Sequence, residues 1–83
     1  MNNKTDRKSV GQRIKELRKK NNETQKELAD IINSTPNSIS KLENGDMGLT
    51  FENMLLIAEH FNVSLDYLCK GEGGSNLLET LNK

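Results

Sequence analysis

Residues 25–44 read QKELADIINSTPNSISKLEN, and this stretch decides the fold. Apolar residues at helical spacing predict two short helices within it, joined by a very short segment. Such a short joint forces the helices to cross steeply, which is the geometry of a helix-turn-helix. Ala29 supplies the small side chain that a close crossing needs, and Asn33 tolerates the left-handed conformation that the turn needs. Ile39 and Leu42 supply apolar anchors on the second helix.

Capping residues mark the starts of five short helices. Thr24 and Glu27 form a capping box before the first helix of the motif. Thr35 precedes Pro36, which suits the first helical position because the N–H that proline lacks would be unpaired there anyway. Because almost no strand pattern is present, we expect an all-α domain of five helices over residues 9–70. The expected N-caps, in chain order, are Ser9 (in a capping box with Gln12), Thr24, Thr35, Thr50 and Ser64.

The helix expected after Thr50 carries apolar residues at intervals of three and four positions. We expect this stripe to face the core, and Leu56 to lie outside it. Its members are Phe51, Met54, Leu55, Ala58 and Phe61.

Both ends of the chain differ in composition from the middle. Residues 1–8 are polar and predict a disordered N-terminal arm. Residues 71–83 begin with a Gly-rich stretch typical of a flexible linker and end in a short leucine-containing tail that can form a helix.

The composition excludes several classes of protein. A chain of 83 residues supports a single domain. No apolar run approaches the roughly 18–20 residues of a membrane span, and residues 1–8 do not form a secretory signal, so we expect a cytoplasmic protein. The single cysteine, Cys69, which we expect to be half-buried, excludes an internal disulfide. Only Cys69 and His60 are good soft metal ligands, whereas a structural zinc site needs four, so we expect no metal or cofactor. We expect His60 to lie on the surface of a helix. No catalytic arrangement of Ser, His and acidic residues stands out, and we expect no enzyme.

The charges are separated along the chain although the formal net charge is zero. Residues 1–41 contain ten Lys or Arg and five Asp or Glu, whereas residues 42–83 contain two basic and seven acidic residues. The basic half can face a polyanion while the acidic half faces away. A solvated, lysine-rich helix face explains the same pattern equally well.

The chain resembles the Cro/C1-type (XRE) helix-turn-helix family of phage and plasmid repressors. The resemblance rests on TQxELA at residues 24–29, on ISKLENG at residues 39–45, and on a gap-free match through residues 51–68. It covers residues 9–70 and implies a lambda-repressor-like fold. Four positions depart from the usual family pattern: Asn33 replaces Gly, Ser34 an apolar residue, Asp46 a basic residue and Leu49 a Pro.

The resemblance implies that the helix after Thr35 lies in the DNA major groove. An Asn side chain can bond adenine, and a Lys can bond guanine or a phosphate. The implied base contacts are Pro36, Asn37, Ser40 and Lys41. A solvated Asn and a proline that only starts its helix are the alternatives.

The resemblance also implies phosphate contacts and one structural ion pair. Arg18 and Glu43 are expected to pair and to fix the recognition helix against the first helix. The implied phosphate contacts are Arg18, Gln25, Thr35, Ser38 and Asn44. For Thr35 and Ser38, helix capping is an equally good interpretation.

These roles together predict a sequence-specific regulator of transcription that binds double-stranded DNA, with a repressor on a palindromic operator as the simplest form. A homodimer would join two half-sites. The alternative is an antitoxin-like or protein-interaction module whose tail binds a protein partner. The candidate dimerisation residues are Met47, Leu49, Leu56, Leu77, Leu78 and Leu81.

Overall fold

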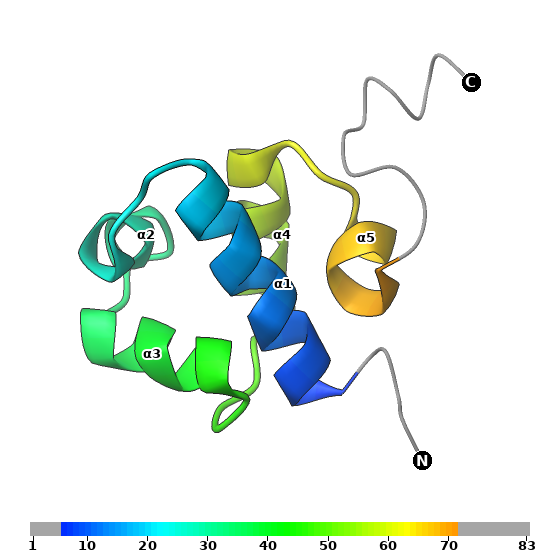
Figure 1. Ribbon diagram of the computed structural model, residues 1–83, viewed down its shortest axis with the longest axis horizontal. Helices are drawn as coiled ribbons and strands as arrows, with labels where there is room; N and C mark the ends of the chain where they lie inside the picture. Colours follow the sequence, from blue (N-terminus) through cyan, green and yellow to red (C-terminus); the bar gives the residue numbers. More distant parts are fainter. Residues whose placement is uncertain (1–5, 72–83) are drawn as a thin grey trace.

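The computed structural model describes residues 6–71, and these residues form five helices without a strand (Figure 1). The predicted all-α fold is therefore confirmed. Predictions for residues 1–5 and 72–83, including the tail, lie outside the described residues. No helix within residues 6–71 has the length and hydropathy that crossing a membrane requires. The helices are α1 (Arg7–Lys20), α2 (Gln25–Ile31), α3 (Pro36–Asn44), α4 (Phe51–Phe61) and α5 (Leu65–Lys70).

Four of the five predicted N-caps are confirmed. Thr24 and Glu27 form the predicted capping box: the Glu27 backbone N–H donates to Thr24 Oγ1 over 3.1 Å, and the Thr24 N–H donates to Glu27 Oε1 over 2.8 Å. The other three capping side chains each accept the N–H of the residue three positions later, and they are Thr35, Thr50 and Ser64.

The start of α1 differs from the prediction, because Asp6 caps the helix instead of Ser9. The Ser9 backbone N–H donates to Asp6 Oδ1 over 2.8 Å. A carboxylate is a strong acceptor and suits the positive end of the helix dipole, so helix formation extends back through Arg7 and Lys8. These two residues therefore do not belong to a disordered arm. The Ser9 bond lowers the pKa of Asp6 below its ordinary value. The cap consequently stabilises the fold above that ordinary value, and the contribution is lost as the pH falls through the folded-state pKa.

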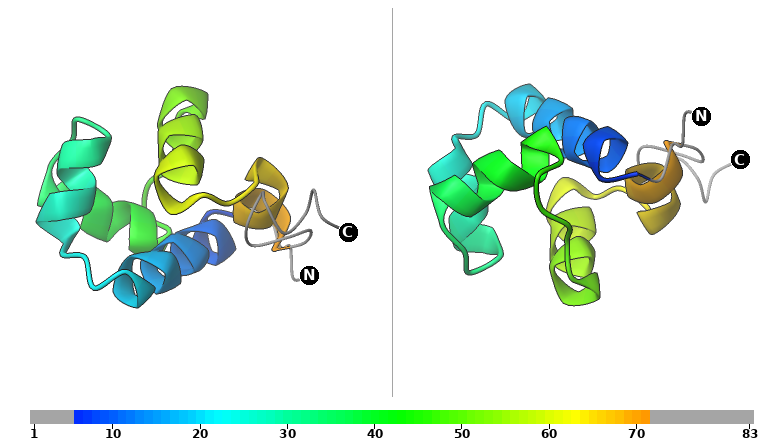
Figure 2. Two further views of the ribbon diagram at one scale, coloured as in Figure 1. Left: turned by 90° about the horizontal axis from the view of Figure 1, so that it is seen from above. Right: turned by 90° about the horizontal axis from the view of Figure 1, so that it is seen from below.

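Each helix contributes a large, fully buried aliphatic residue to the core. Figure 2 shows α2 and α3 on one side of α4 and α5 on the other. A single small core therefore fixes all five helices relative to one another. These residues, in chain order, are Ile14, Leu28, Ile39, Ile57 and Leu68.

The predicted core face of α4 is partly wrong. Ile57 and Ala58 are buried, whereas Phe51 is 68% exposed and Leu55 is 39% exposed. Leu56 is exposed as expected. An apolar helix supports more than one stripe of i, i+3 and i+4 residues, so periodicity alone does not select the face that packs inward.

Gly11 allows α1 and α3 to approach closely. A Cβ atom built at Gly11 would lie 2.1 Å from the backbone oxygen of Leu42 and 2.9 Å from that of Glu43. Backbone atoms of a packed helix cannot move aside as the end of a flexible side chain can. Only glycine therefore fits at this crossing, a requirement that the sequence pattern did not reveal.

We expect Gly11→Ala to destabilise the domain. Alanine favours a helix by about 1 kcal/mol over glycine, but the clash with the α3 backbone is the larger effect. Overpacking of this kind costs about 1–3 kcal/mol, which urea unfolding followed by circular dichroism would measure. Gln12→Ala, an exposed change in the same turn, is the matched control and should leave the midpoint nearly unchanged. A Gly11→Ala variant at least as stable as the parent would contradict the close approach.

Candidate nucleic-acid interface

The inward face of α3 packs against the rest of the domain, whereas its other face is exposed to solvent. Ile39 and Leu42 are buried and fix the helix against α1 and α2. Asn37 and Lys41 lie one turn apart on the exposed face, and Asn44 follows one turn later. Of the remaining predicted base-contacting residues, Pro36 is exposed and Ser40 is partly exposed. The helix thus presents a row of polar side chains on a fixed support.

The start of α3 already uses two of the predicted phosphate-contacting residues for capping. Thr35 Oγ1 accepts the backbone N–H of Ser38 over 3.1 Å and donates to Ser38 Oγ over 3.1 Å. Capping alone therefore accounts for both residue types, and their phosphate contacts remain predictions.

A buried ion pair joins α1 to α3. Arg18 Nε lies 2.6 Å from Glu43 Oε2, and Arg18 Nη2 donates to Glu43 Oε1 over 3.2 Å. Only 8% of Arg18 and 4% of Glu43 is exposed. The predicted pair is present in the structure and is bidentate, the strong form of this contact.

The burial of Arg18 favours a positioning role over a direct phosphate contact. Its third guanidinium nitrogen, Nη1, donates to the backbone oxygen of Glu23 over 2.7 Å. Each guanidinium nitrogen therefore has a protein acceptor.

Gln25, at the start of α2, joins the same network. Its Nε2 atom donates to Glu43 Oε1 over 3.1 Å. The Glu43 carboxylate therefore binds side chains from both α1 and α2. A side-chain amide carries two N–H donors, and this contact uses one of them.

The structure places His60 in a polar contact that the sequence did not indicate. His60 Nε2 on α4 lies 2.5 Å from Glu23 Oε2 in the loop between α1 and α2, and the two side chains are 23% and 17% exposed. His60 is thus more enclosed than expected for a surface residue. The other carboxylate oxygen, Glu23 Oε1, is buried without a hydrogen-bond partner among the described residues. A separation of 37 positions leaves no local signal for this contact.

The predicted dimerisation residues differ in exposure within the described part of the chain. Met47 and Leu56 are exposed, whereas Leu49 is half-buried and packs against the core. The other three candidates, Leu77, Leu78 and Leu81, lie outside the described residues. The exposed large hydrophobic residues that were not among these candidates are Ile31, Phe51 and Leu55.

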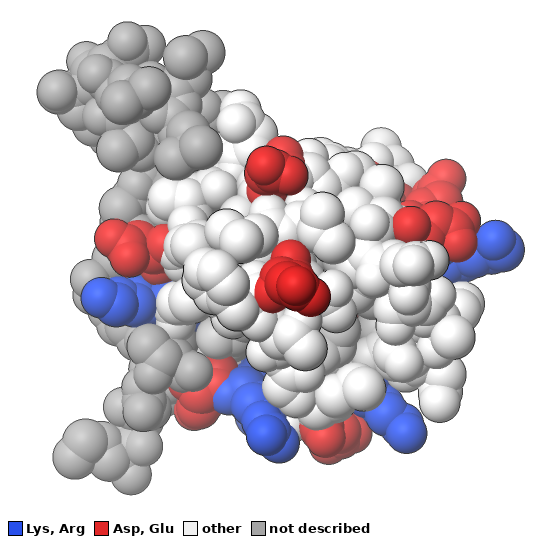
Figure 3. Space-filling view, turned by 180° about the vertical axis from the view of Figure 1, so that it is seen from behind, with Lys and Arg blue, Asp and Glu red and all other residues white. Residues whose placement is uncertain are grey.

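Lys and Arg are concentrated on α1 and absent from α4. Seven of the 14 residues of α1 are Lys or Arg, whereas α4 carries Glu52 and Glu59 and neither Lys nor Arg. Figure 3 shows the face opposite to that of Figure 1, with acidic groups in its middle and Lys or Arg near its edges. Within residues 6–71, no cluster of three or more His, Cys, Asp or Glu could hold a metal ion.

Comparison with known families places this geometry in context. Residues 14–68 match the profile of a helix-turn-helix family. The chain is 38% identical over 77 residues to the HTH-type transcriptional regulator ImmR of Bacillus subtilis (strain 168), a match that covers 90% of this chain and 61% of ImmR. It is 42% identical over 55 residues to antitoxin PezA of Streptococcus pneumoniae serotype 4, a match that covers 66% of this chain and 35% of PezA. The matches thus span less than two thirds of either relative.

A solved structure shares the arrangement of the helices. The crystal structure of the P22 c2 repressor protein in complex with synthetic operator 9T has a TM-score of 0.72 and 32% sequence identity. The match covers 76% of this chain and 96% of that chain.

We expect Glu43→Ala to destabilise the domain strongly, because it leaves the Arg18 guanidinium buried without its carboxylate. Removing one partner of a buried pair costs about 3–5 kcal/mol. Replacing both partners, as in Arg18→Met/Glu43→Leu, leaves no unpaired charge and should cost clearly less. Urea unfolding of both variants tests this difference. If the double variant were the less stable of the two, the charges would not be coupled as described.

Proposed function

Because the chain belongs to the Cro/C1-type helix-turn-helix family, we propose that it is a cytoplasmic regulator of transcription that binds a specific sequence in double-stranded DNA. The observation that carries the proposal is α3 itself, whose inward face is fixed by Ile39, Leu42 and the Glu43 network. Its outward row of polar side chains has the size and chemistry that a DNA major groove accepts. Repression, by excluding polymerase from overlapping sites, is the simplest mechanism.

In this proposal the first turns of α3 read base edges. Asn37 donates to and accepts from adenine through its amide, and Lys41 donates to guanine O6 and N7. Pro36 and Ser40 flank this pair and contact a thymine methyl group, a sugar or a base edge. These contacts supply sequence preference, because base edges differ between base pairs and phosphates do not.

Phosphate contacts at both ends of the motif set the position of α3 in the groove. Gln25 reaches the backbone with the amide N–H that Glu43 does not use, and Asn44 does so beyond the end of α3. Thr35 and Ser38 add hydroxyl groups at the start of α3. Arg18 acts through Glu43 and Gln25, so we assign it to positioning. Binding should weaken as salt rises, because phosphate contacts release counterions.

We further propose that the protein acts as a homodimer on a palindromic operator. One recognition helix spans only a few base pairs, whereas two helices about 34 Å apart read two half-sites on one face of the DNA. Met47 and Leu56 are exposed apolar residues that such an interface can cover.

A second candidate function rests on the similarity to antitoxin PezA. Under that alternative the tail, with Leu77, Leu78 and Leu81, binds a protein partner while the helical domain binds DNA. Both functions can coexist in one chain.

The test of the proposed function is selection of binding sites from a pool of random duplex DNA at about 0.15 M salt. A palindrome with two short half-sites is the expected result. Failure to enrich any sequence, with only weak and salt-sensitive binding, would overturn sequence-specific regulation and favour the protein-partner alternative.

We expect Asn37→Ala to lose preference at one position in each half-site. The lost bidentate contact is worth about 1–3 kcal/mol on the preferred base and little on other bases. Titration of the selected operator and of single-base variants would measure both affinities. An equal loss on every sequence would make Asn37 a backbone contact.

We expect Gln25→Ala to weaken binding to all sequences by a similar factor, because a phosphate contact carries no base information. The same titrations measure this effect, and urea unfolding of the variant shows how much the bond to Glu43 contributes to stability. A loss confined to particular base pairs would contradict the phosphate role.

A further inference from the structure

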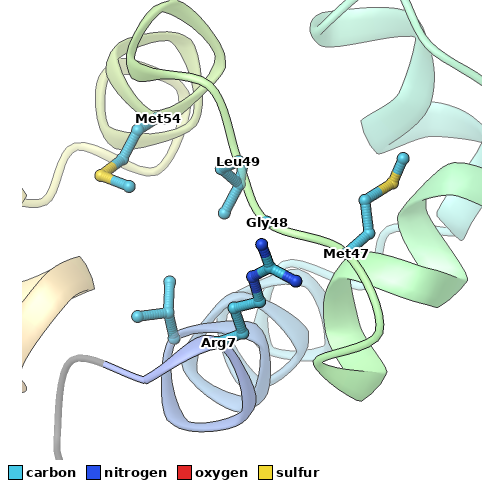
Figure 4. Close-up of a pocket in the computed structure, with 6 residues that line it drawn as sticks. Arg7, Met47, Gly48, Leu49 and Met54 are labelled. Carbon is cyan, nitrogen blue, oxygen red and sulfur yellow. The ribbon is translucent and has the colours of Figure 1, made fainter.

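A small cavity lies between the start of α1, the α3–α4 loop and α4. Its volume is about 250 Å³, below the range of roughly 300–1,000 Å³ that is typical of small-molecule sites. Figure 4 shows the Arg7 side chain extending from α1 toward the loop at Gly48 and Leu49, with Met54 across from it on α4. The lining residues are Arg7, Val10, Met47, Gly48, Leu49 and Met54.

The chemistry of this lining specifies the kind of occupant. Val10, Leu49 and Met54 offer aliphatic and thioether surface, which favours aliphatic side chains. Arg7 is the one charged residue of the lining, and a guanidinium favours a carboxylate beside those apolar groups. A short apolar segment that carries one acidic residue would match this lining.

We propose that this cavity is the docking site of the chain's own residues 77–81, which read LLETL. Leu77, Leu78 and Leu81 supply aliphatic side chains, and Glu79 supplies the carboxylate for Arg7. The docking is intramolecular. It does not depend on the proposed DNA-binding function.

The end of α5 lies beside the cavity, so the tail can reach it. Cys69 Sγ on α5 is 3.2 Å from Sδ of Met54, which lines the cavity. A Cβ atom built at Gly71 would lie 2.9 Å from Nε of Arg13, on the same helix as Arg7 and Val10.

The residues between Gly71 and the leucines set how far the tail can reach. Residues 72–76 number five and include two glycines. Five residues reach about 17 Å when fully extended, and a Gly-rich chain of that length averages about 12 Å between its ends. A tether this short gives the tail an effective concentration in the millimolar range at the cavity. A contact with a dissociation constant of about 1 mM is then occupied for about half of the time.

Charge favours this cavity over the apolar groove along α4. Leu55 and Leu56 border a wider groove of about 710 Å³ between α4 and the end of α2. Glu52 and Glu59 also line that groove, and either one would repel Glu79. The Arg7 cavity attracts the same residue.

Disulfide trapping in the full chain tests the docking. With Cys69→Ala as background, Gly48→Cys and Leu78→Cys place one thiol at the cavity and one on the tail. A Cβ atom at residue 48 would lie 3.0 Å from Arg7 Nε, so the flexible Arg7 side chain must shift by a few tenths of an ångström. Leu55→Cys with Leu78→Cys is the matched control on the α4 groove. In a glutathione redox buffer, the fraction of intramolecular disulfide gives the effective concentration of the two thiols. We expect a value at least tenfold higher for the Gly48 pair, and circular dichroism checks that each variant folds.

Two further variants separate a specific contact from simple proximity. Arg7→Ala should lower the effective concentration of the Gly48 pair, whereas Lys8→Ala, which does not change the lining, should leave it unchanged. Equal trapping at residues 48 and 55 would overturn the docking site. Disulfide-linked dimers in place of intramolecular disulfides would overturn docking within one chain and assign the cavity to the tail of a second copy.

Methyl resonances of the methionines give a test without cysteine variants. Replacing Leu77, Leu78 and Leu81 by Ser should shift the Met54 methyl signal, because Met54 lines the cavity. An unchanged Met54 signal in the folded variant would overturn the proposal.

Discussion

The buried carboxylate of Glu43 is the interaction on which the rest of the structure depends. It accepts hydrogen bonds from Arg18 on α1 and from Gln25 on α2, while it belongs to α3 itself. A buried charge is tolerated only with partners in good geometry, so the three helices have little freedom to change their relative positions. This constraint acts near the C-terminal end of α3, on the side opposite to its outward polar row. The orientation of that row is therefore set from inside the domain.

Close packing adds a second constraint on the same helix. Gly11 brings the α1 backbone against the carbonyl groups of Leu42 and Glu43. On the other side, Glu23 in the α1–α2 loop contacts His60 on α4 and offers its backbone oxygen to Arg18. The loop that precedes Gln25 is thus held from two directions. A helix supported in this way enters a groove without being reordered, which reduces the entropic cost of binding.

Two apolar surfaces outside the core, the cavity beside Arg7 and the groove along α4, differ in charge. The cavity beside Arg7 carries a cation, whereas the groove along α4 carries carboxylates. A domain of this size buries only part of its apolar surface, so such surfaces are the natural places for further contacts. Because the charges are opposite, a segment with an acidic residue is expected to bind only the first surface. The α3–α4 loop lines the first surface and also follows the recognition helix, so contacts made there lie close to the proposed DNA interface.

The sequence by itself determined the features that depend on neighbouring residues. Thr24, Thr35, Thr50 and Ser64 each cap a helix through a bond to the residue three positions later, and Asn33 takes the left-handed conformation of the turn. Asp6 shows the limit of this local reasoning: the polar residues 1–8 predicted a disordered arm and Ser9 the first cap, whereas Asp6 caps α1 in the structure.

Only the tertiary structure decided which face of α4 is buried, why residue 11 is glycine, and that Glu23 meets His60. Each of these features depends on contacts between residues far apart in the chain, and the local sequence does not indicate which distant residues come together. The Arg18–Glu43 pair could be predicted only through the family resemblance. Periodicity fixes the existence of a helix, but packing against the other helices selects its orientation.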